Sequence, residues 1–195
     1  MADYNIEHTQ EKKDMVTKLT VGLCCDAVHL NKNMRSMFEK YDLTISKKFV
    51  EKYKLSSNKV KFQYILDLME YEENCEKKMA PGLTKRKVAK LNNFQKMDAK
   101  RSLAVFSEDV AAGLASLAEF EDIPEMKTTA KFVSMVAEWF KRMKCRTKEL
   151  AFSYENMEKH KEQCDFLKEF MEFFCTIKIK PNQKELWAVQ KGNLF

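Results

Sequence analysis

The sequence predicts a mainly α-helical fold with one short strand-to-helix unit near the N-terminus. Its 195 residues include only 4 glycines and 3 prolines, but 14 phenylalanines and 12 methionines. This mixture favours helices over turn-rich sandwiches, and a hydrophobic content of 45% is sufficient for a core. Apolar residues also recur at helical spacing along most of the chain.

The strand-to-helix unit comes first. The segment Lys18–Cys25, KLTVGLCC, is rich in β-branched and apolar residues and leads directly to Asp26. From Ala27 the spacing becomes helical, because one apolar stripe contains Leu30, Met34, Met37 and Phe38.

Four further helices are predicted by periodicity and breakers. The second helix extends from about Asn58 to Tyr71 and is followed by the breaker pair Pro81–Gly82. The longest helix begins after Asn92 or Asn93 and continues through Leu114. Its small residues, Ala111, Ala112, Gly113 and Ala115, permit close packing by a neighbour.

Ile123 and Pro124 end the longest helix. Thr128 or Thr129 can cap the next one, whose apolar stripe includes Phe132, Val133, Val136, Ala137 and Phe140. A last helix is expected from about Ser153 to Phe174.

Composition excludes several classes of protein. No apolar run approaches the roughly 20 residues that a membrane span needs, and residues 1–18 are polar rather than signal-like. The six cysteines form no CxxC pair, which favours reduced core thiols over a zinc site or a disulfide framework. We therefore expect an intracellular protein without a membrane partner.

Positive charge is concentrated in one segment. From Lys77 to Arg101 there are nine basic residues and a single acid, Asp98, within a chain of net charge +6. Such a segment could contact nucleotide phosphates or a DNA backbone, or it could be an ordinary solvated helix face. The candidate DNA contacts are Lys85, Arg86, Lys87 and Lys90.

Asp26 is the sharpest candidate for chemistry. A carboxylate at a strand end can bind Mg²⁺ when other carboxylates converge on it, but the same residue can also be a helix N-cap. The sequence contains no GxxxxGK[ST] loop and no GxGxxG turn, so a nucleotide site would have to be unconventional.

The run from Cys25 to Arg35, CDAVHLNKNMR, resembles the acid-x-x-His-Leu-x-Lys-x-x-Arg segment of P-element-type (THAP-family) DNA transposases. The block from Asn93 to Leu114, with FQKM and VFSEDVAAGL, is similar to the block that opens the family's GTP-binding insertion. The segment from Thr129 to Phe140, with TAKFV and WF, is similar to the next helix of that insertion in the family. The segment Lys180–Gln183, KPNQ, resembles the point where the family's chain returns into the nuclease fold.

This resemblance implies a helical insertion domain attached to a remnant of an RNase H-like fold. Residues 1–18 would be a polar lead, 19–55 a partial RNase H-like segment, 56–180 the GTP-binding-insertion-like domain, and 181–195 the start of the return. It implies a metal-binding role for Asp26, contacts from Lys96 and Ser107 to nucleotide phosphates, and stacking of Phe140 on the base.

The other acids of the family's catalytic triad would lie before residue 19 and after residue 195, so we expect no nuclease activity from this polypeptide alone. Lys141 stands where the family has an acid, which weighs against GTP selectivity. The resulting hypothesis is a non-catalytic GTP-binding module from a nuclear, P-element-like transposase, with Mg²⁺ as a possible cofactor. Possible partners are DNA, a full-length transposase or a second copy. The alternative is a helical DNA- or protein-interaction module without nucleotide binding.

Overall fold

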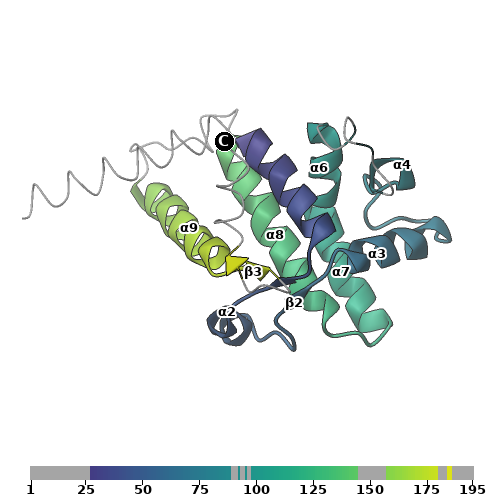
Figure 1. Cartoon of the computed structure of the whole chain (residues 1–195), viewed down its shortest axis with the longest axis horizontal. Helices are drawn as coiled ribbons and strands as arrows, with labels where there is room; N and C mark the ends of the chain where they lie inside the picture. Colours follow the sequence, from purple (N-terminus) through teal and green to yellow (C-terminus); the bar gives the residue numbers. More distant parts are fainter. Residues whose placement is uncertain are drawn as a thin grey trace, which may run out of the picture.

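The computed structural model describes residues 27–88, 92, 95, 98–144, 157–179 and 184–185. Helices dominate this part of the chain, which confirms the mainly α-helical fold (Figure 1). A first helix covers residues 27–40. The other helices are α2 (Lys47–Lys52), α3 (Gln63–Glu73), α4 (Lys85–Val88), α6 (Ala99–Val105), α7 (Glu108–Phe120), α8 (Met126–Met143) and α9 (Met157–Cys175).

A small antiparallel sheet joins the two ends of the described chain. Its strands are β1 (Leu43–Thr44), β2 (Lys59–Val60), β3 (Lys178–Ile179) and β4 (Lys184–Glu185), in the order β2-β1-β3-β4. Leu43 pairs with both Val60 and Ile179, so one residue of β1 links two segments that are far apart in the sequence.

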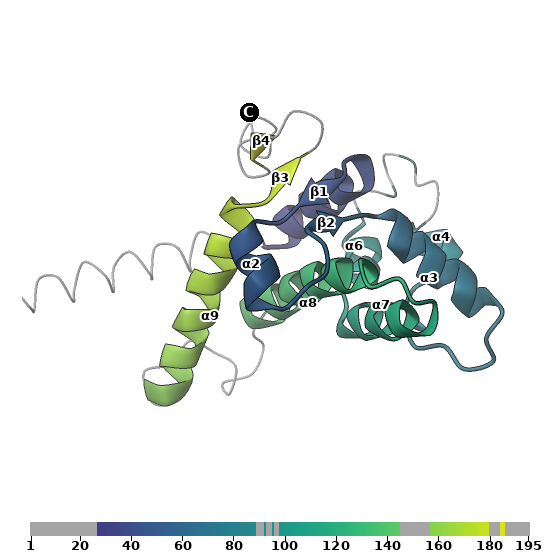
Figure 2. The ribbon, with the colours of Figure 1, turned by 90° about the horizontal axis from the view of Figure 1, so that it is seen from below.

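Helix α8 forms the centre of the molecule (Figures 1 and 2). Twelve of its 18 residues are buried, because helix 27–40, α7, α9 and the sheet cover it on different sides. One hydrophobic cluster includes residues from every helix named above, and Phe38 is one of its fully buried members. The ring of Phe38 is 0% exposed and lies 5.1 Å from Phe132, 5.2 Å from Phe62 and 6.2 Å from Phe106.

Among the small residues of α7, Gly113 has the expected packing role, whereas Ala112 is exposed. A Cβ on Gly113 would lie 3.1 Å from a methyl carbon of Leu68, so the glycine allows α3 to approach α7 closely. Proline and glycine at 81–82 lie in the turn between α3 and α4, and Ile123–Pro124 lie between α7 and α8, as predicted.

Several predicted boundaries were wrong. Residues 58–62 are not helical, because Lys59–Val60 pair with β1, and the helix begins only at Gln63. The predicted long helix through Leu114 is broken at Phe106–Ser107, which separates α6 from α7. Ser107 has an extended backbone, and its Oγ accepts a hydrogen bond from the amide of Val110 at 3.3 Å. This local bond competes with helix continuation.

Thr128 and Thr129 are not N-caps. Helix α8 begins at Met126, so both threonines lie inside it and are 0% exposed. The hydroxyl of Thr128 donates to the carbonyl of Ser57 at 2.7 Å, and the hydroxyl of Thr129 accepts from the amide of Lys61 at 3.2 Å. The two side chains therefore attach α8 to the segment around β2.

An ionic cluster joins α2 to α9. Lys52 lies 2.5 Å from Glu169, which also accepts a hydrogen bond from the Tyr53 hydroxyl, and Lys48 pairs with Glu172. Burial tends to raise the pKa of Glu169, but hydrogen bonds from Lys52 and Tyr53 outweigh it and lower that pKa. Lys131 of α8 lies 4.1 Å from the Tyr53 ring centroid and completes the cluster.

The predicted strand Lys18–Cys25 lies outside the described residues, as do residues 153–156 of the last predicted helix. The described part of that helix, α9, extends to Cys175, one residue beyond the predicted end. No helix among the described residues is long and apolar enough to cross a membrane.

Candidate functional site

The start of α7 and the end of α8 lie together. The two helices are joined by the short connection 121–125 and lie side by side (Figures 1 and 2). Lys141 in the last turn of α8 donates to Glu108 in the first turn of α7, at 2.9 Å. Ser107, the N-cap of α7, therefore lies at the same end of the helix pair as Phe140 and Lys141. Three positions singled out in the sequence are thus brought to one place.

Lys141 already has an ion-pair partner in the structure. Its hydrogen bond to Glu108 raises the pKa of the lysine, and the charges of Glu108 and Glu138 raise it further. Glu108 and Asp109 are acids in the first turn of α7, where the helix dipole favours negative charge. A phosphate at this end would have to compete with Glu108 for the lysine.

Phe140 is packed into the protein. Its side chain is 7% exposed, the Trp139 ring lies 6.4 Å away in an edge-on arrangement, and Lys144 lies 5.8 Å from its centroid. Stacking of a base on this ring requires a local opening that exposes its face.

The basic segment forms a surface over α4 and α6. Lys85, Arg86 and Lys100 are exposed, and the guanidinium of Arg101 donates to the carbonyl of Arg86 at 2.5 Å, which ties the two helices together. Lys87 is partly buried and donates to the carbonyl of Gly82 at 3.0 Å. The Nζ atom of Lys85 lies 3.9 Å from Oε2 of Glu73, which is a long ion pair. Asp26, Lys90 and Lys96 lie outside the described residues.

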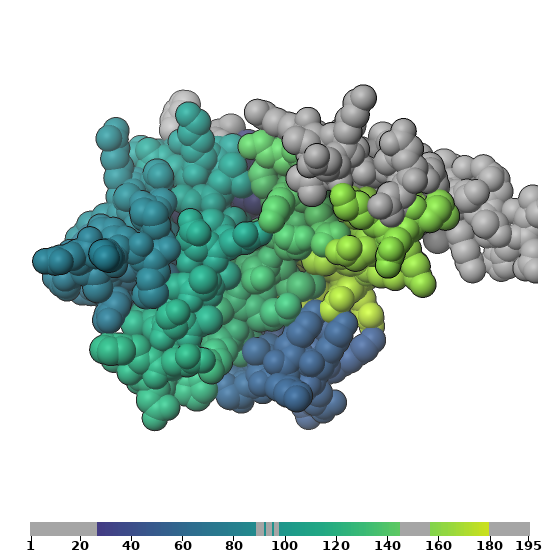
Figure 3. Space-filling model, turned by 180° about the vertical axis from the view of Figure 1, so that it is seen from behind, coloured from purple at the N-terminus to yellow at the C-terminus, as the bar shows by residue number. Residues whose placement is uncertain are grey.

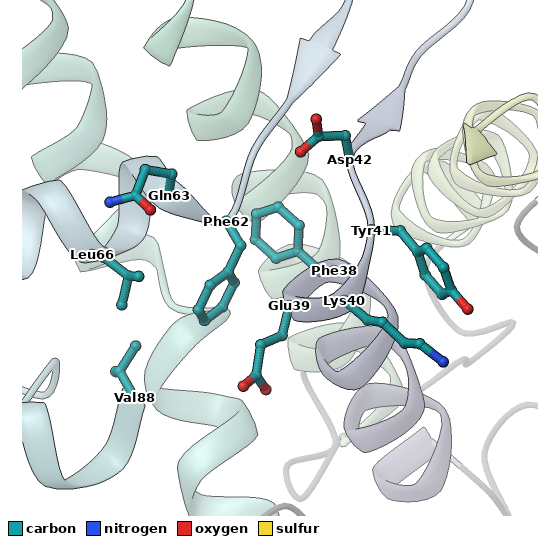
Figure 4. A pocket seen from close by; sticks show the side chains of 9 residues that line it. All are labelled: Phe38, Glu39, Lys40, Tyr41, Asp42, Phe62, Gln63, Leu66 and Val88. Atoms are coloured by element: carbon teal, nitrogen blue, oxygen red, sulfur yellow. The ribbon is translucent and has the colours of Figure 1, made fainter. Parts of the chain in front are cut away.

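A pocket of about 440 Å³ lies where helix 27–40 ends against α3 and α4 (Figure 4). Phe38, Phe62, Leu66 and Val88 form its apolar part, while the side chains of Lys40 and Tyr41 point away. Gln63 donates to Asp67 at 2.8 Å. The sequence did not reveal this pocket, because its walls come from three separate segments and follow no motif.

A shallower groove of about 600 Å³ lies between α7, α8 and the end of α2, on the face seen in Figure 3. Its floor consists of small residues, and Glu108 lies on its border. Its floor residues are Ala111, Ala112, Ala115, Ala130 and Ser134.

The described residues contain no group of three or more His, Cys, Asp or Glu side chains that could hold a metal ion. The sequence-based suggestion of Mg²⁺ depends on Asp26, which is not among them.

Comparison with known proteins identifies the family of this chain. Residues 28–155 match the family described as "TNP-like, GTP-binding insertion domain". Among solved structures, the chain is similar to one described as "Drosophila P element transposase strand transfer complex", with a TM-score of 0.62 and 18% identity. The similarity covers 83% of this chain and 35% of that chain, so this chain spans about a third of the length of that protein. No curated protein matches.

The structural similarity shows a shared fold, and the family match covers more than half of the chain. Both findings agree with the resemblance to P-element-type transposases seen in the sequence. The chain therefore belongs to the family of transposase-like GTP-binding insertion domains.

Proposed function

We propose that this chain is a non-catalytic nucleotide-binding module of a P-element-like transposase, and that the nucleotide is bound where α7 begins and α8 ends. The observation that carries the proposal is the ion pair between Glu108 and Lys141, because it fixes Ser107 and Phe140 at the same end of the helix pair. The description of the matching family, which names GTP binding, supports a nucleotide as the ligand, and the N-cap hydroxyl is a suitable partner for phosphate oxygens.

Lys141 determines which base this site can select. A carboxylate accepts hydrogen bonds from the N–H groups on the edge of guanine, whereas an ammonium group can only donate. We therefore propose that the chain binds purine nucleotides with little preference for GTP over ATP.

The test measures the melting temperature of the full chain as GTP or ATP is added in increasing concentration. A nucleotide at about 100 times its dissociation constant should stabilise the wild type by about 2.7 kcal/mol. Lys141→Asp should raise the preference for GTP over ATP by about tenfold or more, because a bonded polar contact of this kind contributes about 1–3 kcal/mol.

The chain contains a matched control for this substitution. Lys127 lies 3.0 Å from Glu119 at the opposite end of the same helix pair, in an exposed ion pair of the same kind. Lys127→Asp should leave nucleotide binding unchanged. The proposal fails if neither nucleotide shifts the melting temperature of the wild type or of Lys141→Asp at millimolar concentration.

A second candidate function rests on the α4–α6 surface, where exposed Lys85, Arg86 and Lys100 could bind the DNA backbone. Replacing all three by alanine should weaken binding to duplex DNA and lower the slope of log affinity against log salt by about 3, if each contacts one phosphate. Fluorescence anisotropy between 50 and 200 mM salt would measure this. The same change at exposed Lys47, Lys59 and Lys178, which lie elsewhere, provides the control. If both triple variants lost the same affinity for duplex DNA, the α4–α6 surface would not be a defined DNA-binding surface.

A further inference from the structure

Three polar side chains of helix 27–40 and α6 are buried, and each has at least one polar atom without a hydrogen-bond partner among the described residues. Arg35 and Asn31 are each 1% exposed, and Ser102 is 0% exposed. Within the described part of the chain, no hydrogen bond reaches either polar atom of the Asn31 amide, the Nε and Nη1 atoms of Arg35, or the Ser102 hydroxyl. Only Nη2 of Arg35 has a partner, the carbonyl of Val88 at 3.3 Å. Buried polar groups in proteins are nearly always bonded, so this cluster requires an explanation.

The register of the two helices brings these side chains together. The rings of Phe38 and Phe106 are stacked 6.2 Å apart, and Arg35 and Ser102 lie about one helical turn before them in their respective helices. Asn31 lies one turn before Arg35, on the same face of its helix. Arg101, the neighbour of Ser102, acts electrostatically on Arg35, which agrees with this register. Helix 27–40 and α6 lie side by side in both views (Figures 1 and 2).

The charges around Arg35 leave its guanidinium poorly compensated. Burial lowers the pKa of Arg35 most strongly, Glu39 one turn further along opposes this effect, and Arg101 lowers the pKa further. Arg101 has its own counterion, Asp98, at 3.4 Å. Arginine nevertheless remains charged in proteins, and a buried charge costs several kcal/mol unless it is paired and fully hydrogen-bonded.

We propose that Arg35, Asn31 and Ser102 form an internal binding site for a phosphoryl oxyanion. The two unpartnered guanidinium nitrogens, the amide NH₂ group and the hydroxyl can all donate, and a compact oxyanion can accept from several of them at once. Its charge would also compensate the buried guanidinium, which ordered water would not do. This site does not rest on the proposed nucleotide site at α7 and α8.

The neighbouring pocket provides the route to this site. Val88 contributes its carbonyl to Arg35 and its side chain to the pocket of about 440 Å³. Arg35 therefore lies directly behind the pocket wall, although its side chain does not line the pocket. Entry of the oxyanion from the pocket therefore requires α4, a helix of four residues, to move away from Arg35.

The experiment measures the melting temperature of the full chain in chloride buffer at constant ionic strength, with added inorganic phosphate or GTP. Phosphate at about 100 times its dissociation constant should raise the wild-type melting temperature by roughly 5–10 °C in a saturable manner. Arg35→Met should melt no lower than the wild type in chloride, since it removes a poorly compensated buried charge, and should show no phosphate shift. A second variant, Asn31→Leu with Ser102→Ala, should weaken phosphate binding at least tenfold.

The two ligands distinguish the source of the oxyanion. A shift with GTP alone that disappears in Arg35→Met would identify a nucleotide phosphate as the ligand and would support the site. Arg86→Met removes an exposed arginine and is the control, so it should keep the melting-temperature shift caused by phosphate or by GTP. Lys141→Asp should also keep the shift caused by phosphate, even if it changes GTP binding. The proposal is wrong if Arg35→Met keeps the shift of the wild type, or if neither phosphate nor GTP stabilises the wild type more than chloride does.

Discussion

Phe38→Ala should lower the free energy of unfolding by about 3–5 kcal/mol, the cost of removing a fully buried aromatic ring and leaving a cavity. The effect should be large because Phe38 contacts Phe62, Phe106 and Phe132 and is 0% exposed. The ring thereby connects helix 27–40 to α8, to the start of α3 and to the end of α6. Urea denaturation followed by circular dichroism would measure the loss.

Phe120→Ala is the matched control for this substitution. Phe120 is 73% exposed and its only described ring contact is with Tyr71, at 5.7 Å. Its replacement should change the stability by about 0.5 kcal/mol or less. If Phe38→Ala were no more destabilising than Phe120→Ala, residues 27–40 would not share a core with the rest of the chain.

The double substitution Thr128→Val and Thr129→Val should cost about 1–3 kcal/mol for each hydroxyl. Valine has nearly the same shape as threonine, so packing is retained while the Ser57 carbonyl and the Lys61 amide lose their partners. The same denaturation experiment measures the loss, and Ser116→Ala, at an exposed position of α7, should be close to neutral. A neutral double variant would mean that α8 is not attached to the β2 segment through these bonds.

These threonines illustrate what the sequence could not predict. A threonine before an apolar stripe is a typical N-cap, and local patterns do not reveal that Met126 already belongs to the helix and that the hydroxyls bond to residues 68 and 71 positions away. The two-residue strands could not be predicted for the same reason, because Leu43 and Val60 form a strand pair only through tertiary contact. In contrast, every residue of the predicted α8 stripe is buried, since Phe132, Val133, Val136, Ala137 and Phe140 recur at helical spacing. The stripe was narrower than the buried face, which also includes Met135, Trp139 and Met143.

The candidate site was accessible to sequence reasoning only through the family resemblance. Neither Ser107 nor Phe140 carries a pattern that distinguishes a ligand contact from an N-cap or a core aromatic, and the structure shows both in those structural roles. The partner of Lys141 could not be predicted, because Glu108 lies 33 residues away in the sequence. The buried cluster at Arg35 was equally hidden, since it depends on the register between helix 27–40 and α6.

Nucleotide binding where α7 begins and α8 ends is tested most directly by titration calorimetry of GTP and ATP into the full chain. We expect saturable binding of both nucleotides to the wild type, unchanged binding in Lys127→Asp, and a gain in GTP preference of about tenfold or more in Lys141→Asp. If neither nucleotide gave a heat of binding with the wild type or with Lys141→Asp, the chain would not bind nucleotides at this place.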